Sequence, residues 1–315
     1  MSAYVLRRLA LFVPTLIGVS IVVFVLVRLL PGDATTLQLQ DAKSSAADEA
    51  ALRHQLGLDK PIVLQYTDWV GTLARGDLGR SLWTKESILV EFARRFPVTL
   101  ELTLLTLIIS VTFGIGVGVI SAIRQETWID YVGRVVAVMA LAMPVFWLAI
   151  LVVVIPSIYW RWTPLWTYVT LTADPLENLK ILIFPAAVFG VSRAGPIMRI
   201  TRSAMLEVQR QDYIRTAWAK GLPERSVIFK HAIKNALIPV VSIVGQQIHF
   251  YLAGSVIIET IFRLPGIGSF FVEALIRLDY PVVQSVNLIV ATFVLLLNLI
   301  VDFSYAYLDP RIRYQ

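Results

Sequence analysis

Six stretches of this chain are apolar over about the 20 residues that an α-helix needs to cross the hydrocarbon core of a membrane. In chain order they are Leu9–Leu30, Leu100–Ile123, Val135–Ile158, Leu179–Gly195, Ala236–Ile258 and Val282–Phe303. Backbone groups find no water in that core, so a chain that spans it must form helices or a closed barrel. The sequence therefore predicts an all-α integral membrane protein of about six transmembrane helices.

Two of these stretches need comment. The first follows Arg7 and Arg8, as the apolar part of a secretory signal would, but it is too long for a cleaved signal and no small-residue cleavage site follows it. We expect it to be retained as a span. The fourth is the shortest, and Pro185, Gly190 and the pair Gly195-Pro196 interrupt or end it.

Composition excludes several classes of protein. Only 16% of the residues are charged, against roughly 25% in soluble domains. The chain has no cysteine, which removes disulfides, thiolate metal sites and cysteine nucleophiles, and only three histidines, His54, His231 and His249. The net charge of +6 is explained by basic residues on cytoplasmic loops. We therefore expect no metal site and no nucleic-acid partner.

The basic residues also predict the orientation of the chain. Six spans place both termini on one side, and short loops rich in Lys and Arg lie in the cytoplasm. The side that holds the termini carries Arg7, Arg8, Arg124, Arg134, Arg311 and Arg313, and also Arg199, Arg202, Arg210, Arg215, Lys220, Arg225, Lys230 and Lys234. The segment 31–97 holds eight basic residues too, but it is longer than the roughly 60 residues over which the rule applies. Both termini are therefore predicted to be cytoplasmic.

The extracytoplasmic segment 31–97 is predicted to form a small helical cap. Asp48 precedes a helix over Glu49–Leu56, which Gly57 can end, and Pro61 can open a second helix. The second helix has apolar residues at three- and four-residue spacing, namely Ile62, Tyr66, Trp69, Val70 and Leu73. We expect this face to pack on the chain's own spans, with a partner protein as the alternative.

The cytoplasmic segment 199–235 is predicted to form two helices joined at a sharp turn. Ser203–Lys220 has no helix breaker, and Tyr213 with Ala217, like Ile214 with Trp218, would share a helix face. Gly221 then stops the helix, and Pro223 can start a second one that runs over Ser226–Ala236 into the fifth span. This layout would present a short rigid knob to a soluble partner, whereas a solvated basic loop would explain the charge alone.

Two sets of residues within the spans are also informative. Small residues recur at every fourth place in the second span, at Ser110, Gly114, Gly118 and Ala122, which predicts close packing of helices. Polar residues lie in the fifth and sixth spans, at Gln246, Gln247, His249, Asn287 and Asn298. Such groups avoid lipid, so they either line a water-filled path or form hydrogen bonds between helices.

Motifs for nucleotide hydrolysis and hydrolytic catalysis are missing from the sequence. It contains no G-x-x-x-x-G-K-[ST], no H-E-x-x-H and no G-x-S-x-G. We therefore assign no catalytic residues to this chain.

Short strings spread from end to end resemble those of one family. They are Tyr4-Val5-Leu6-Arg7-Arg8-Leu9, Leu30-Pro31-Gly32-Asp33, Leu56-Gly57-Leu58-Asp59-Lys60-Pro61, Gly76-Asp77-Leu78-Gly79, Glu259-Thr260-Ile261-Phe262, Pro265-Gly266-Ile267-Gly268, Asp279-Tyr280-Pro281 and Leu308-Asp309-Pro310-Arg311. In this order, they make the sequence resemble the inner-membrane permeases of bacterial ABC importers of the peptide/nickel class, specifically the dipeptide and oligopeptide B-type subunit. The resemblance implies the fold of a type I ABC importer permease.

The resemblance also gives the cytoplasmic segment a role. The stretch from Asp212 to Leu222 is similar to the EAA loop, through which such permeases engage their ATPase. It implies a coupling loop that contains Asp212, Arg215, Thr216, Ala217, Lys220 and Gly221. Arg215, Thr216 and Ala217 stand where the general pattern has a glutamate and two alanines, so the resemblance carries over a docking surface and not a specific ion pair.

The resemblance further implies the partners. This chain would form half of a translocation pore in a bacterial inner membrane, beside a second, related permease and the membrane lipid. Two ATP-binding subunits would hold ATP and Mg, and an extracytoplasmic binding protein would deliver the substrate; the chain itself needs no cofactor. The expected layout is 1–30 for the first span, 31–97 for the extracytoplasmic segment and 98–315 for the permease core, with the coupling loop at 199–235.

Other readings are kept open. The cargo could be di- or oligopeptides, nickel chelates, glutathione or short sugars. An ion-driven secondary transporter would show internal repeats and a pair of discontinuous helices, and only the fourth span is interrupted. A membrane enzyme would need clustered ionisable groups, whereas Arg193, His249 and Asp302 are scattered along the chain.

Overall fold

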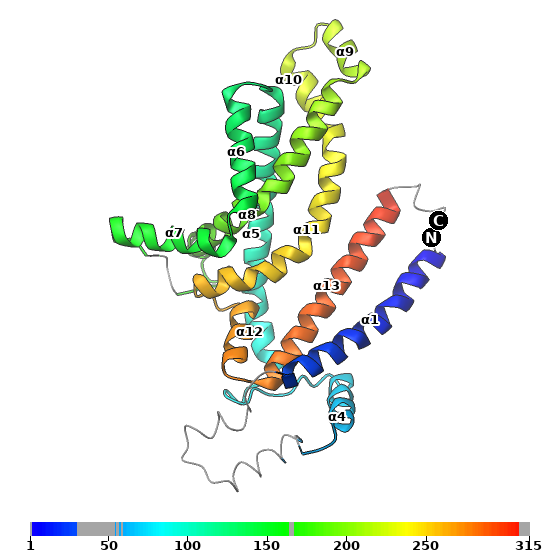
Figure 1. Ribbon diagram of the computed structural model, residues 1–315, viewed down its shortest axis with the longest axis vertical. Coiled ribbons are helices and arrows are strands. Elements are labelled where there is room, and N and C mark those ends of the chain that lie inside the picture. Colours follow the sequence, from blue (N-terminus) through cyan, green and yellow to red (C-terminus); the bar gives the residue numbers. More distant parts are fainter. Residues whose placement is uncertain (1, 30–53, 55–56, 58, 164–166, 309–315) are drawn as a thin grey trace. The chain divides into compact units, whose positions relative to one another are not determined.

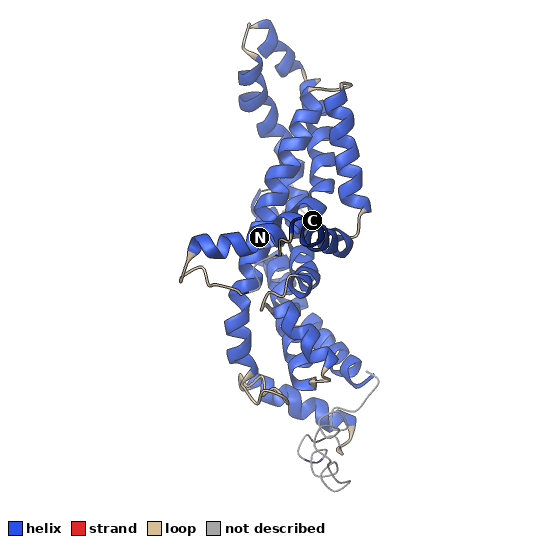
Figure 2. Cartoon of the chain, turned by 90° about the vertical axis from the view of Figure 1, so that its left-hand side faces the viewer, coloured by secondary structure: helices blue, strands red, loops and turns tan. Residues whose placement is uncertain are grey.

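The computed structural model describes residues 2–29, 54, 57, 59–163 and 167–308, and nearly all of its regular structure is helical (Figures 1 and 2). Apart from the helices, the described residues contain one isolated bridge, between Arg80 and Ser87. The chain divides into two compact units: a terminal unit, Met1–Pro97 with Gly266–Gln315, and a central unit, Val98–Pro265. The predicted limits 1–30, 31–97 and 98–315 stay a prediction.

The terminal unit is built on two long helices that pack side by side. These are α1 (Ser2–Leu29) and α13 (Tyr280–Leu308). The unit also contains the shorter helices α4 (Ile62–Ala74) and α12 (Ile267–Ile276) (Figure 1). Its core is apolar and contains Val27, Ile88, Phe270, Ala274, Val282 and Val286. The sequence did not predict α12.

One buried carboxylate ties the segment 31–97 to the start of α13. Asp279, which is 3% exposed, accepts hydrogen bonds from the Ser81 hydroxyl at 2.6 Å and from the Leu82 backbone N–H. The Ser285 hydroxyl donates to the Leu78 carbonyl at 2.7 Å. The strings that contain Leu78 and Asp279 in the sequence are therefore in contact in the fold.

The central unit places one long helix, α8 (Pro175–Gln209), among its neighbours. These are α5 (Ile88–Ile123), α6 (Trp128–Ala142), α7 (Val145–Trp160) and α11 (Ile233–Ile261). Residues 88–97 of α5 belong to the terminal unit and 98–123 to the central one. The core around α8 includes Leu102, Ala149, Leu182, Phe189 and Ile258.

The connection between α7 and α8 is held by a buried hydrogen-bond cluster. The Tyr168 hydroxyl donates to Glu101 at 2.7 Å, and the Asn178 amide donates to Glu101 and to the Val169 carbonyl, each at 2.9 Å. Burial, followed by the hydrogen bond to Glu101, holds the pKa of Tyr168 well above its usual range. Tyr168 therefore remains a neutral donor to the carboxylate at any physiological pH.

Among the described residues, five helices are long and apolar enough to cross a membrane, and there are six candidate spans if α6 and α7 count as one. Two predicted details are wrong. The fourth span does not end at Gly195, because α8 continues to Gln209 with Pro185 and Pro196 inside it. Prolines are tolerated in such helices where neighbouring helices surround them, and α8 is the most buried of the candidate spans.

The second correction concerns the third predicted span, Val135–Ile158, which is not one continuous helix. The chain bends by 102° between α6 and α7, at Met143 and Pro144. Proline disfavours helical backbone in the residue before it, and Met143 has an extended ψ of 124°. The 15 residues of α6 would reach only about 22 Å at 1.5 Å per residue, so α6 alone is shorter than the hydrocarbon core.

The cap predicted over residues 31–97 is described only in part. Asp48 and most of the predicted helix Glu49–Leu56 lie outside the described residues, as do the strings around Pro31 and Pro310. The second helix is α4, and its Tyr66 and Trp69 rings lie 5.2 and 5.8 Å from the ring of Phe24 on α1. Packing on the chain's own span is thus confirmed for this face, although Ile62 at its start is 62% exposed.

The small residues of the second span pack within the chain, as predicted. A Cβ atom on Gly118 would lie 2.6 Å from Thr201 and 2.8 Å from the Met198 carbonyl oxygen, and one on Gly114 would lie 2.7 Å from Ile197. Such distances mean that the backbones of α5 and α8 nearly touch. Ser110 adds a hydrogen bond of 2.7 Å to the hydroxyl of Tyr251 on α11.

This contact predicts opposite outcomes for two glycines of α5. Gly118→Ala should destabilise the protein by about 1–3 kcal/mol through overpacking, because the Met198 backbone cannot yield as a flexible side chain can. Gly116 has nothing within 4 Å of its added Cβ, so Gly116→Ala is the matched control and should be neutral or stabilising. Thermal unfolding of the purified complex in detergent measures both; equal effects would contradict this packing.

Candidate coupling loop and translocation path

The segment 199–235 forms helices joined at a sharp turn, as predicted, but its first helix is split in two. The predicted single helix Ser203–Lys220 is wrong, because α8 ends at Gln209 and α9 (Asp212–Ala219) begins after an extended Gln211. The turn lets α9 fold back so that Ile214 and Ala217 join an apolar cluster with Met205, Val227, Ile228 and Ala232. We call this set, together with Val119, Ala122, Ala204 and Ala236, the elbow cluster.

The apolar face of α9 also differs from the prediction. Ile214 and Ala217, three residues apart, are the buried pair, whereas Tyr213 and Trp218 are 43% and 48% exposed. In each of the predicted pairs, Tyr213–Ala217 and Ile214–Trp218, one residue is therefore buried and the other is exposed. Two aromatic side chains remain available on the surface of a loop that is otherwise charged.

Gly221 ends α9 in the conformation that the sequence suggested. Its φ is +72°, a left-handed value that favours glycine. The Gly221 N–H donates to the Trp218 carbonyl at 2.9 Å and the Leu222 N–H to the Ala217 carbonyl at 3.4 Å, which is the bond pattern of a Schellman motif. No atom lies within 4 Å of an added Cβ at Gly221, so only backbone conformation restricts this position.

After the turn the chain enters the next long helix through an irregular segment. Pro223 precedes the short α10 (Glu224–Ser226), and a π-helix (η1, Val227–Ala232) joins it to α11. The second predicted helix and its continuity with the fifth span are confirmed. The π-helical turn was not predicted; such turns concentrate at functional sites in other proteins.

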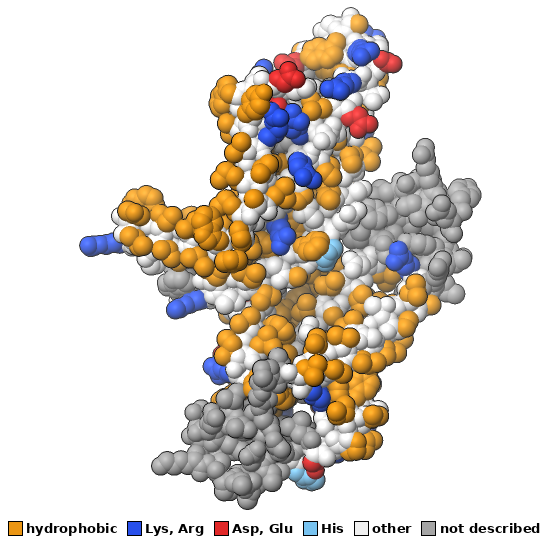
Figure 3. All heavy atoms as spheres, viewed as in Figure 1, with side chains coloured by type: hydrophobic (Ala, Val, Ile, Leu, Met, Phe, Trp, Pro, Cys, Tyr) orange, Lys and Arg blue, Asp and Glu red, His pale blue; other side chains and the backbone are white. Residues whose placement is uncertain are grey.

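The polar residues of the predicted coupling loop lie in solvent. Asp212, Arg215, Thr216 and Lys220 are all exposed, and Arg215 approaches Asp212 at 3.4 Å. Figure 3 shows basic, acidic and hydrophobic side chains together at the α9 end of the central unit. The backbone here is fixed by Ala217 and Gly221, while the exposed side chains are free to meet another protein.

The predicted path residues are divided between the two units. On α11 of the central unit, Gln247 is 8% exposed and its amide nitrogen has no hydrogen-bond partner, Gln246 is exposed, and His249 is half-buried. On α13 of the terminal unit, Asn287 is half-buried and Asn298 is exposed. Among the described residues, none of the five forms a hydrogen bond to another helix, so their role stays a prediction.

Arg193, near the midpoint of α8, is a functional candidate that sequence reasoning passed over. It is half-buried, its Nε has no hydrogen-bond partner, and its guanidinium lies 5.5 and 5.9 Å from the ring centroids of Phe189 and Phe250. Among the described residues no carboxylate lies within 4.0 Å of it. A lone cation in the middle of a span is costly unless water or a ligand reaches it. An arginine inside an apolar stretch was therefore the sequence signal that could have identified this residue.

A buried ion pair links α6 to α8 beside the elbow cluster. Asp130 is fully buried and accepts two hydrogen bonds from Arg202, at 2.7 and 2.8 Å, together with bonds from the Ser121 hydroxyl and the Glu126 backbone N–H. The partners are 72 positions apart in the sequence, so no local pattern predicts the pair. It fixes the α5–α6 turn against α8.

Comparison with known proteins decides the family. Residues 114–314 match the model of the family described as binding-protein-dependent transport system inner membrane component, and residues 1–103 match the model of its N-terminal part. This chain belongs to that family. It is a membrane permease subunit of an ABC importer, and a multi-pass protein of the inner-membrane permease class.

Individual relatives agree with this assignment over their full lengths. The chain is 42% identical over 335 residues to the di/tripeptide transport system permease protein DppB of Pseudomonas aeruginosa (strain UCBPP-PA14), covering 100% of both chains. It is 38% identical over 338 residues to the dipeptide transport system permease protein DppB of Escherichia coli (strain K12), again covering 100% of both.

A solved structure supports the fold alone. The crystal structure of an amino acid ABC transporter with histidines shares 15% identity, has a TM-score of 0.50, and covers 68% of this chain and 94% of its own. The type I ABC permease fold predicted from the sequence is confirmed by the family match and this likeness together.

The conformation of Gly221 gives a sharp prediction. Gly221→Val should lower substrate transport by about tenfold, since left-handed backbone costs a residue with a Cβ roughly 1–2 kcal/mol, which corresponds to about 5–30-fold in the population of the turn. Gly221→Asn is the matched control and should keep most of the activity, because asparagine tolerates this conformation and the added side chain meets open space. Uptake into vesicles, with complex assembly checked by co-purification, measures both variants. Equal loss in the two would mean that φ at residue 221 is not the constraint.

Proposed function

We propose that this chain forms half of the translocation pathway of an ATP-driven importer of di- and tripeptides, and that it couples to cytoplasmic ATPase subunits through α9 and the Gly221 turn. The observation that carries the coupling is the elbow cluster. Through it, Ile214 and Ala217 on the exposed knob pack against residues of α5, α8 and the base of α11. A displacement of α9 by a docked ATPase would therefore act directly on three helices of the central unit.

The peptide cargo is supported by the relatives' names. Proteins 42% and 38% identical to this chain over their whole lengths are called di/tripeptide and dipeptide transport permeases. Nickel chelates and oligosaccharides are the alternatives within the same class of importer. The proposed assembly also contains a second permease, two ATPase subunits that bind ATP and Mg, and an extracytoplasmic binding protein, with both termini of this chain in the cytoplasm.

We place Arg193 and Gln247 in the pathway. Gly254 on α11 allows α8 to approach closely there, because a Cβ at that position would lie 2.5 Å from the Phe189 ring and 3.3 Å from Arg193 Nη2. The guanidinium and the Gln247 amide thus belong to facing helices and both have nitrogen atoms without partners. A peptide carboxylate is the chemical group that would satisfy such donors.

Reconstitution tests the proposed function. The assembled complex, in proteoliposomes with its binding protein and enclosed ATP, is expected to accumulate a labelled dipeptide, and a variant of the ATPase subunits that cannot hydrolyse ATP should abolish this accumulation. Uptake driven by an ion gradient without the ATPase subunits would contradict the importer assignment for this chain. Accumulation of nickel chelates or oligosaccharides in place of dipeptides would contradict the cargo.

Trp218, which is exposed on α9, is expected to contribute to the affinity of ATPase docking. Trp218→Ala should weaken ATPase binding by about 30-fold, since interface tryptophans commonly contribute 2 kcal/mol or more. Trp160→Ala is the matched control, because Trp160 is also exposed, at 71%, but ends α7, which has no part in the knob. The affinity is measured by titrating purified ATPase subunits onto the permease pair. Equal affinities for the two variants would show that α9 is not the docking surface.

Arg193 gives a prediction about charge selectivity. Arg193→Gln should lower uptake of a dipeptide by about tenfold or more, as expected for loss of a hydrogen bond to a charged group, and the loss should be largest for peptides with an additional carboxylate. Arg193→Lys keeps the charge and should restore part of the uptake. If the variants changed thermal stability but not the ratio of anionic to neutral peptide uptake, Arg193 would serve only to pack against Phe189 and Phe250.

A further inference from the structure

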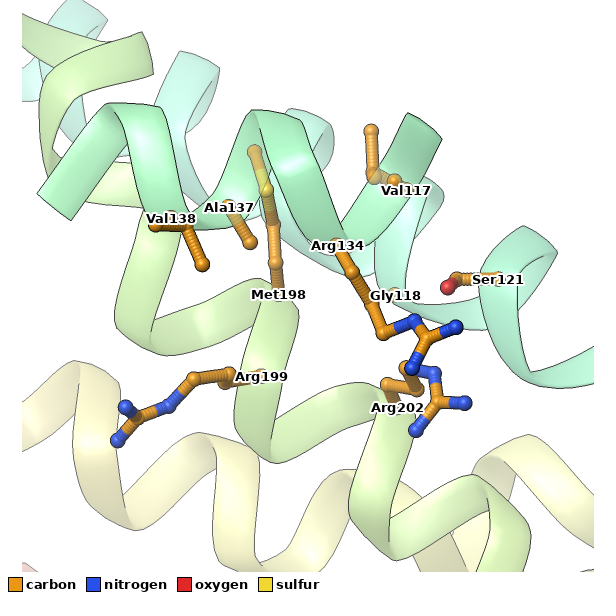
Figure 4. A pocket seen from close by; sticks show the side chains of 10 residues that line it. Val117, Gly118, Ser121, Arg134, Ala137, Val138, Met198, Arg199 and Arg202 are labelled. Atoms are coloured by element: carbon orange, nitrogen blue, oxygen red, sulfur yellow. The ribbon is translucent and has the colours of Figure 1, made fainter. Parts of the chain in front are cut away.

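A cavity of about 160 Å³ opens in the central unit between α5, α6 and α8, beside the buried Asp130–Arg202 pair (Figure 4). It is lined by Val117, Gly118, Ser121, Gly133, Arg134, Ala137, Val138, Met198, Arg199 and Arg202. Its walls are apolar, and the stems of the three arginines form part of them. Figure 4 shows the guanidinium groups of Arg134 and Arg202 side by side near Ser121, while Arg199 points to the opposite side.

The charges around this cavity do not balance. Arg202 is held by two hydrogen bonds to Asp130, and Asp130 is already saturated by Ser121 and Glu126. Arg134 reaches Asp130 only at 3.7 Å, and its side chain is 45% exposed. No described carboxylate lies within 4.0 Å of Arg199. Arg134 and Arg202 thus share one carboxylate, and the guanidinium of Arg134 otherwise lies over the ring of Tyr131, 4.4 Å from its centroid. This leaves positive charge for an anion that enters from outside the protein.

The surroundings of the cavity are those of a membrane interface. The outer face of α6 exposes apolar side chains beside the opening, with Val135 57% and Val138 60% exposed. About one and two turns before Val135, at the start of α6, Tyr131 and Trp128 are 57% and 73% exposed, and such aromatic residues favour the level of the lipid headgroups. Apolar walls do not stabilise a small soluble anion, whereas they provide a favourable surface for an acyl chain.

We propose that this cavity binds one anionic phospholipid, with its phosphate at Arg134, beside Arg202, and the upper part of an acyl chain against Ala137, Val138 and Met198. Basic pockets between spanning helices on the cytoplasmic side are suited to such headgroups. The assignment to the cytoplasmic leaflet rests on the orientation in the proposed function. A lipid bound here would hold α6 against α8 next to the elbow cluster.

The test uses the intact importer complex, purified in mild detergent and stripped of lipid. Phosphatidylglycerol, phosphatidylethanolamine and inorganic phosphate are added separately, and retention is measured by native mass spectrometry together with the rise in unfolding temperature. We expect phosphatidylglycerol to be retained and to stabilise the complex. Arg134→Gln should weaken its retention by about fivefold, at roughly 1 kcal/mol for one basic residue.

Two further variants keep the proposal falsifiable. Arg225→Gln/Lys230→Gln removes two exposed charges from the segment 199–235 and should leave retention unchanged; an equal loss would show that general surface charge binds the lipid. Val138→Trp fills the mouth of the cavity without changing charge and should also abolish retention. Equal stabilisation by inorganic phosphate would identify a free-anion site and overturn the lipid assignment. If accessibility labelling placed the α5–α6 turn outside the cytoplasm, the orientation would fail instead, independently of lipid binding.

Discussion

Close contact between helix backbones at α8 is the constraint on which the central unit depends. In lipid no hydrophobic force drives one apolar helix onto another, so association rests on tight packing and on hydrogen bonds. Gly114 and Gly118 of α5 and Gly254 of α11 supply that packing, since a Cβ at any of them would lie less than 3.0 Å from an atom of α8. The Asp130–Arg202 pair adds the polar contact. With α8 fixed in this way, Arg193 is held at mid-span and the elbow cluster is held at its end.

This arrangement gives coupling a physical route. The knob is not a flexible loop attached to a pore, because α9 is joined to α8 by a two-residue turn and to α10 by Gly221, and its apolar face is buried in the elbow cluster. The same cluster includes Ala232 and Ala236, at the junction of the π-helix and α11. The π-helical turn is the irregular part of this connection. A push on Tyr213 or Trp218 would therefore move packed helices as a body, which is how sub-ångström shifts become larger motions in packed cores.

Local chemistry predicted those parts of the fold that depend on few residues. Apolar length gave the spans, the four-residue repeat through Gly118 gave the packing face of α5, and Gly221 followed by Pro223 gave the turn. The kink at Pro144 was missed because an unbroken apolar run was weighed above the backbone restriction of a single proline. The Asp130–Arg202 pair could not be found, since its partners are 72 positions apart and only the tertiary fold brings them together. Arg193 was passed over because a single charge forms no sequence pattern. Only the tertiary structure shows that its neighbours are aromatic rings and that, among the described residues, no carboxylate pairs with it.

We propose that α9 and the base of α11 move as one body when ATP binds to the ATPase subunits. The chain has no native cysteine, so Ala219→Cys and Phe229→Cys, both at exposed positions, can carry a pair of spin labels in the assembled importer. The distance distribution between the labels, measured by pulsed electron paramagnetic resonance in the nucleotide-free and ATP-trapped states, is predicted to be the same narrow peak in both. A shifted or broadened distribution in the trapped state would show that the Gly221 turn bends independently, and would contradict this account of coupling.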